Sequence, residues 1–141
     1  MVATQSLSVL ETSPPRFSAE EVAAIAADLF DLRGEAVDLG SERDQTFLIE
    51  DGGRRCVLKI SNVGEDPAVL DLEASALRHI ARVDPELPIA RLRGSGTCEG
   101  PDGTHFVRLF DRMPGRNPGA DVDAQACRSA EFVAVHVCFL F

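Results

Sequence analysis

Two residues of opposite charge, a lysine and a glutamate, stand where they could together form a binding site for an anionic group. Lys59 lies inside an apolar segment, residues 55–60, between Leu58 and Ile60, and lysine is seldom found inside an apolar segment. Glu73 follows in the next predicted element. An ammonium group can hold nucleotide phosphates, and a nearby carboxylate can hold the ammonium in place. Each residue alone also fits an ordinary role, as an edge lysine facing solvent and as a solvated helix glutamate.

A helix is predicted ahead of this segment, after residue 18. Ser18 is a suitable N-cap, and Glu21 three residues later completes a capping box. Apolar residues then recur at helical spacing. Arg33 suits the C-terminal end of the helix, and Gly34 can adopt the left-handed conformation that ends it.

After Gly34 the hydrophobic period changes to two. Strands are predicted at 36–39, 46–50 and 55–60, with a hairpin turn at 51–53. In the third strand two sets of alternating side chains point to opposite faces. One set is Cys56, Leu58 and Ile60, and the other is Arg55, Val57 and Lys59.

A second helix is predicted from Asp66, its N-cap, and Pro67 at the first helical position. Its apolar side is predicted to consist of Val69, Leu72, Ala76, Leu77 and Ile80. Two strands follow, at 89–93 and 104–110, joined by a glycine-rich turn at 94–103. The expected fold is α+β, a five-stranded antiparallel sheet with an N-terminal helix and a helix between the third and fourth strands.

Composition narrows the partners and the location. The chain has 141 residues and a net charge of −9, which argues against a nucleic-acid partner. No apolar run approaches the roughly twenty residues of a membrane helix, and no secretory leader is recognisable, so a cytoplasmic location is expected. The cysteines are widely spaced and form no CxxC pair, which favours reduced thiols over zinc. They are Cys56, Cys98, Cys127 and Cys138.

Three segments together carry a family resemblance. They read LGSERDQTFLIEDGGRRCVLKISN, AVLDLEASALRHI and FVRLFDRMPG. They resemble the aminoglycoside phosphotransferase and choline kinase superfamily, nearest its hydroxylysine-kinase-like branch, whose relatives are also found fused to class III aminotransferases. The similarity runs from about residue 17 to residue 115 and implies a protein-kinase-like N-terminal lobe.

The resemblance assigns roles to particular residues. It places Lys59 on the phosphates of ATP (or GTP), with Glu73 as its ion-pair partner. Val57 would form part of the adenine wall. The loop that positions the nucleotide would contain Ser41, Glu42, Arg43, Asp44 and Gln45, although it lacks the GxGxxG pattern. The hinge would contain Phe110, Asp111 and Met113, with the Asp111 carbonyl and the Met113 N–H facing the adenine edge.

Phosphoryl transfer in this family also requires Mg²⁺, a catalytic aspartate that usually follows a histidine, and a metal-binding aspartate, all in the C-terminal lobe. None of His79, His105 and His136 is followed two places on by an aspartate. We therefore expect a lead-in at 1–16, a nucleotide-binding lobe at 17–115, and an atypical tail at 116–141 that a truncation or frame shift would explain.

The resemblance implies the ATP-binding lobe of a kinase acting on a hydroxyl group of an amino-alcohol or hydroxylysine-like substrate. The lobe alone would bind nucleotide weakly or not at all and would lack activity. The small-molecule substrate would require the C-terminal lobe, and a fused or separate enzyme domain would be a further partner. The alternative is a non-catalytic, kinase-like binding or assembly module.

Overall fold

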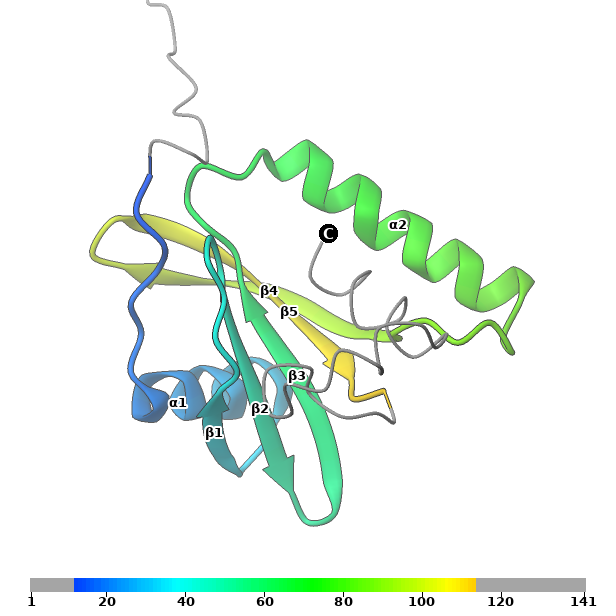
Figure 1. The fold of residues 1–141 in the computed structure, drawn as a ribbon, viewed down its shortest axis with the longest axis horizontal. Helices are drawn as coiled ribbons and strands as arrows, with labels where there is room; N and C mark the ends of the chain where they lie inside the picture. Colours follow the sequence, from blue (N-terminus) through cyan, green and yellow to red (C-terminus); the bar gives the residue numbers. More distant parts are fainter. Residues whose placement is uncertain (1–11, 114–141) are drawn as a thin grey trace, which may run out of the picture.

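The computed structural model describes residues 12–113. Five antiparallel strands form one sheet in the order β1-β2-β3-β5-β4, accompanied by two helices (Figure 1). The predicted α+β fold is confirmed. Along the chain the elements are α1 (Ala19–Phe30), β1 (Glu35–Asp38), β2 (Gln45–Asp51), β3 (Arg54–Ile60), α2 (Pro67–Val83), β4 (Leu92–Gly100) and β5 (Gly103–Asp111).

The hydrophobic core lies between α1 and one face of the sheet. Alternate residues of β2, β3 and β5 point to this face, because side chains along a strand alternate between its two sides. The buried members of the core are Val22, Ala26, Leu32, Phe47, Ile49, Cys56, Leu58, Ile60, Val107 and Leu109. The predicted facing of Cys56, Leu58 and Ile60 is therefore confirmed, and Val57 and Lys59 belong to the opposite face.

The start of α1 is as predicted, but its end differs. Ser18 N–H donates to the Glu21 carboxylate at 2.7 Å and Ser18 Oγ accepts from Glu21 N–H at 3.2 Å, which completes the capping box. The left-handed residue that ends the helix is Asp31 (φ 52°), not Gly34. Gly34 serves a different purpose, because a Cβ there would lie 1.8 Å from the backbone oxygen of Glu50 in β2.

The predicted strand 89–93 and glycine-rich turn 94–103 are wrong, because β4 runs through most of the proposed turn. Gly94 and Gly96 are strand residues that let α1 approach the sheet closely. A Cβ on Gly94 would lie 2.8 Å from the ring of Phe30, and one on Gly96 would lie 3.2 Å from a leucine of the same helix. At these two positions glycine is therefore explained by the packing of α1 rather than by a turn.

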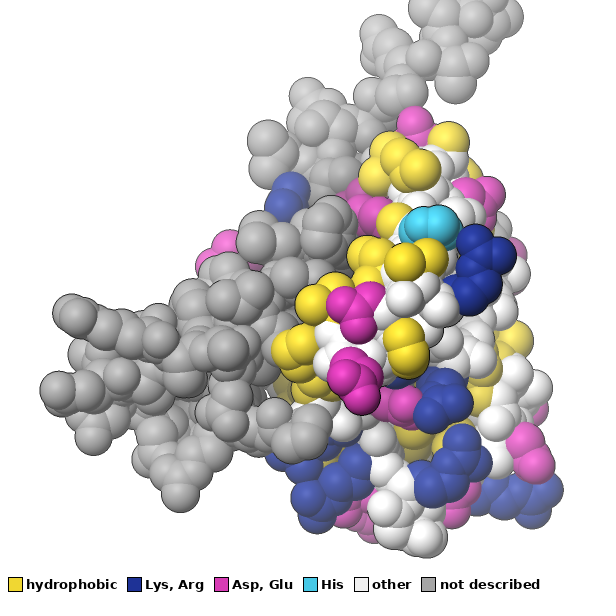
Figure 2. Space-filling view, turned by 90° about the vertical axis from the view of Figure 1, so that its right-hand side faces the viewer, with side chains coloured by type: hydrophobic (Ala, Val, Ile, Leu, Met, Phe, Trp, Pro, Cys, Tyr) yellow, Lys and Arg dark blue, Asp and Glu magenta, His cyan; other side chains and the backbone are white. Residues whose placement is uncertain are grey.

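The predicted apolar side of α2 is also partly wrong. Asp66 caps the helix as expected, accepting from the backbone N–H of Ala68 at 2.9 Å. Val69 and Leu72, however, are 45% and 69% exposed, whereas Leu70 is buried. The shift from residue 69 to residue 70 turns the helix by about 100°. Figure 2 shows this side of the molecule, where hydrophobic side chains lie among acidic and basic ones.

Candidate functional site

The sheet face opposite α1 carries two adjacent rows of side chains, one apolar and one polar. Strand pairing places one apolar residue of each strand in a single line across the sheet, which we call the apolar row. Its members are Val37, Leu48, Val57, Phe110 and Leu92. Two residues further along β3 lies the polar row, made of Thr46, Lys59, Arg108 and Ser95. The rows meet where the Arg108 guanidinium carbon lies 5.9 Å from the centre of the Phe110 ring.

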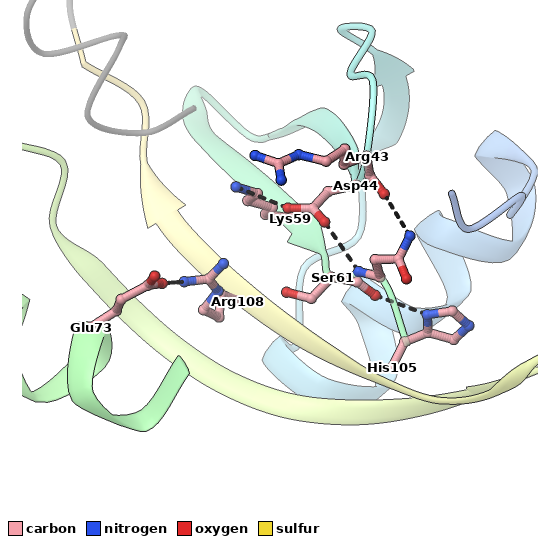
Figure 3. A network of polar contacts seen from close by, with 8 residues as sticks. Arg43, Asp44, Lys59, Ser61, Glu73, His105 and Arg108 are labelled. Atoms are coloured by element: carbon pink, nitrogen blue, oxygen red, sulfur yellow. Dashed lines mark hydrogen bonds and ion pairs between the residues drawn. The ribbon is translucent and has the colours of Figure 1, made fainter. Parts of the chain in front are cut away.

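Lys59 forms an ion pair with Asp44, from the end of the loop that precedes β2. Lys59 Nζ lies 3.0 Å from Asp44 Oδ2, and the two side chains are only 6% and 10% exposed. The second carboxylate oxygen of Asp44 accepts a hydrogen bond from the backbone N–H of Asn62 at 3.1 Å (Figure 3). Both oxygens of Asp44 are thus engaged, which holds the carboxylate in one orientation.

Glu73 reaches the same face from α2, but it pairs with Arg108 instead of Lys59. Arg108 Nη1 donates to Glu73 Oε2 at 2.7 Å, and the side chains are 4% and 16% exposed (Figure 3). The expected Lys59–Glu73 pair is therefore replaced by two separate pairs. Sheet order explains the exchange: β5 lies between β3 and β4, and α2 packs beside β4, so Arg108 meets the helix first.

Sequence reasoning missed Arg108, although a signal was present. Arg108 stands inside the apolar segment FVRLF just as Lys59 stands inside VLKI. A charged residue within an apolar strand was the observation that singled out Lys59, and it applies equally to Arg108. The register then places the two cations directly opposite each other in β3 and β5.

The side chain of Asn62, also missed, joins three segments behind Asp44. Its amide nitrogen donates to Arg43 O at 3.2 Å and to Ser13 O at 3.1 Å. Its amide oxygen accepts from Gly64 N–H at 2.9 Å and from the hydroxyl of Thr12. Asn62 is buried, so this network fixes the end of the loop against the chain ahead of α1.

Gln45 makes a second connection to the chain ahead of α1. Its side-chain oxygen accepts from Phe17 N–H at 2.7 Å, and its side-chain nitrogen donates to Phe17 O at 3.1 Å. Of the predicted nucleotide loop, Asp44 and Gln45 are therefore fixed by side-chain contacts. Ser41, Glu42 and Arg43 are exposed.

Two buried hydroxyls lie near Lys59. Among residues 12–113, Thr46 Oγ1 and Ser61 Oγ are buried and have no hydrogen-bond partner. Thr46 is the cross-strand neighbour of Lys59 in β2, and Ser61 follows Lys59 by two residues in the chain. A buried polar group without a partner is costly, so these hydroxyls indicate that a polar ligand would be favourable here.

The surroundings of Glu65 disfavour its ionised form. The pKa of Glu65 is raised, first by burial and then by the negative charges of Asp44 and Glu73, while Lys59 and Arg43 oppose the rise. Glu65 therefore shares its surroundings with two other carboxylates.

The predicted hinge residues lie at the end of β5. The Asp111 carboxylate binds Arg93 at 2.7 and 2.6 Å, and Asp111 N–H donates to Arg91 O at 2.9 Å. Phe110 is buried in the apolar row, and Met113 is partly buried. These contacts hold the strand end in place, and the adenine contacts of Asp111 and Met113 stay predictions.

The described part of the chain also contains a buried histidine and two cysteines, which contact the packed interior. His105 is buried, with Nδ1 2.9 Å from Ser61 O and its ring edge-on to Phe17. Cys56 and Cys98 are thiols, and burial raises the pKa of both. Cys127, Cys138 and His136 lie outside the described residues.

Between residues 12 and 113 there is no cluster of His, Cys, Asp or Glu that could hold a metal ion. Neither of the two helices in this range is long and apolar enough to cross a membrane.

Comparison with known proteins identifies a family and a similar fold. Residues 34–136 match the family model described as the phosphotransferase enzyme family, so the match includes much of the tail that the sequence set apart. A solved structure of the microcompartment-associated aminopropanol kinase is similar, with 20% identity and a TM-score of 0.57. The similarity covers 70% of this chain but 33% of the kinase chain, about a third of its length. No curated protein matches. With a family match over most of its length, the chain belongs to the phosphotransferase enzyme family.

Proposed function

We propose that this chain is the ATP-binding N-terminal lobe of a phosphotransferase that acts on a hydroxyl group of an amino-alcohol or hydroxylysine-like substrate. The observation that carries the proposal is the pair of adjacent rows on one sheet face. An apolar row suits the flat faces of an adenine ring, and a polar row containing Lys59 and Arg108 suits phosphates. Family membership and the likeness to a kinase fold support it.

In this proposal the nucleotide lies across both rows. The adenine packs against Val57 and Phe110, and the phosphates extend toward Lys59, which lies two residues beyond Val57 in β3. The unpartnered hydroxyls of Thr46 and Ser61 would donate hydrogen bonds to phosphate oxygens. The exposed part of the loop, from Ser41 to Arg43, would contribute backbone N–H groups.

The contribution of this lobe to the reaction is electrostatic. Lys59 neutralises charge on the phosphates and orients them, which is the main task of a protein in phosphoryl transfer. The described residues hold no cluster suited to a metal ion, so we assign no metal-dependent step to them. The amino-alcohol substrate class is supported by the name of the structural neighbour, an aminopropanol kinase. Substrate binding and the catalytic base are assigned to the C-terminal lobe of the family.

The proposal is tested by measuring ATP and adenosine binding to the 141-residue chain by calorimetry. Lys59→Met should weaken ATP binding by about tenfold or more, because a charge-assisted contact to phosphate is lost. Adenosine, which has no phosphates, should bind equally to both proteins. Arg55→Met is the matched control, since Arg55 lies on the same strand and face but is exposed and paired with Glu50. Equal ATP affinity in wild type and Lys59→Met would contradict the proposal.

A further inference from the structure

We infer that Asp44, rather than Glu73, is the residue that positions Lys59 for the nucleotide. Glu73 instead fixes α2 to the sheet through Arg108. This inference rests on the proposed nucleotide site, and it assigns different tasks to the two carboxylates that reach the polar row. It also differs from the Lys59–Glu73 pairing that the family resemblance implied.

The geometry around Asp44 is that of a positioning group. One carboxylate oxygen lies 3.0 Å from Lys59 Nζ, and the other accepts from Asn62 N–H at 3.1 Å. Asp44 and Lys59 are both buried, so water screens their attraction weakly. An ammonium has three N–H donors, and one ion pair with Asp44 is therefore compatible with further contacts to phosphate oxygens.

Asp44 is held in turn by its neighbours along the chain. The side chain of Asn62 donates to the carbonyl of Arg43, the residue before Asp44, and to the carbonyl of Ser13. Gln45, the residue after Asp44, contacts the backbone of Phe17 through both its side-chain oxygen and its side-chain nitrogen. The position of the lysine is thus linked to the loop that would cover the nucleotide.

Glu73 has a different set of contacts. Its carboxylate accepts from Arg108 at 2.7 Å, and this contact joins α2 to β5. Loss of the Glu73 charge would leave the buried guanidinium of Arg108 without this carboxylate, which is costly to the fold. We therefore expect Glu73 to affect stability, and to affect nucleotide binding without acting through Lys59.

A double-mutant cycle on ATP affinity separates the two assignments. Asp44→Asn should weaken ATP binding by about tenfold, the equivalent of one charge-assisted contact, and should leave adenosine binding unchanged. In a Lys59→Met background Asp44→Asn should have no further effect, because the residue through which it acts is gone. Glu73→Gln should change ATP affinity by the same factor in both backgrounds.

The results of this cycle distinguish failure of the Asp44 assignment from failure of the proposed nucleotide site. If Lys59→Met leaves ATP affinity unchanged, or the chain binds no ATP, the nucleotide site itself is contradicted. If Lys59→Met weakens binding but Asp44→Asn adds its full effect in that background, only the role of Asp44 is overturned. Coupling of Glu73→Gln to Lys59→Met would likewise overturn the inference.

Urea unfolding of the nucleotide-free chain tests the pairing by a second route. Asp44→Asn and Lys59→Met should be non-additive, with the double variant losing less than the sum of the single losses in unfolding midpoint. The exposed pair Glu50–Arg55, which joins β2 to β3, is the control cycle and should be nearly additive. Stronger coupling of Lys59 to Glu73 than to Asp44 would overturn the assignment whether or not ATP binds.

Discussion

Three carboxylates gather around the two buried cations of the polar row. Asp44 binds Lys59 and Glu73 binds Arg108, while Glu65 lies close enough for both carboxylates to raise its pKa. Burial is the first cause of this rise, and the two neighbouring negative charges add to it. A carboxyl group whose pKa is raised by folding makes the stability of the protein depend on pH.

Glu65→Gln should stabilise the protein near neutral pH. The pKa of Glu65 is raised in the folded chain above its ordinary value of 4.5, so folding favours the protonated form. That contribution is fully present below the ordinary value and is lost as the pH rises through the folded pKa. The glutamine variant avoids the loss, by less than about 1 kcal/mol because water screens a partly exposed group.

Urea unfolding of wild type and Glu65→Gln across pH checks this. The gain should be present at neutral pH and should vanish below 4.5, where glutamate is protonated in both states. Glu42→Gln, in the exposed part of the neighbouring loop, is the control and should show no such pH-dependent gain. A gain of equal size at all pH values would contradict the assigned cause.

The sequence indicated several charged residues of the site, but not which residues form ion pairs with each other. The alternation of β3 predicted that Lys59 and Val57 share the face opposite the core, and the side chain of Lys59 is buried there. Its partner could not be found from sequence, because pairing depends on the order of strands in the sheet. β5 stands between β3 and β4, which brings Arg108 rather than Lys59 to Glu73.

At the scale of elements, local signals predicted the structure well and packing signals did not. The capping box at Ser18 and the turn at 51–53 involve only neighbouring residues, and Gly52 and Gly53 have the positive φ angles that the turn needs. The glycines of β4 and the rotation of α2 depend on what packs against them. Gly94 is glycine because α1 lies over it, a fact that residues 89–103 alone do not contain.

Gly34→Ala tests the close contact between the start of β1 and β2. The added Cβ would lie 1.8 Å from the backbone oxygen of Glu50, a distance that only movement of the strand can relieve. We expect a loss of about 2–4 kcal/mol in the free energy of unfolding. Urea unfolding measures it, with Glu35→Ala at the adjacent exposed position as the control. A loss no larger than that of the control would show that the strands separate easily here.

At the scale of the whole molecule, the sheet has two faces with different tasks. The face under α1 holds the hydrophobic core, and the opposite face holds the apolar and polar rows. The alternation of β3 predicted this division, since neighbouring residues of one strand serve different faces. The rows themselves required the register of all five strands, which the sequence does not specify by itself.

The central claim is that ATP binds the face of the sheet that carries the two rows, and nuclear magnetic resonance of the labelled 141-residue chain tests it most directly. On addition of ATP, the methyl groups of Val57 and the amide of Lys59 should shift. The methyl groups of Leu58 and Ile60, on the opposite face, should not. Adenosine should shift Val57 and leave Lys59 unchanged, because it has no phosphates. Shifts confined to Leu58 and Ile60, or no shifts on either face, would contradict the account.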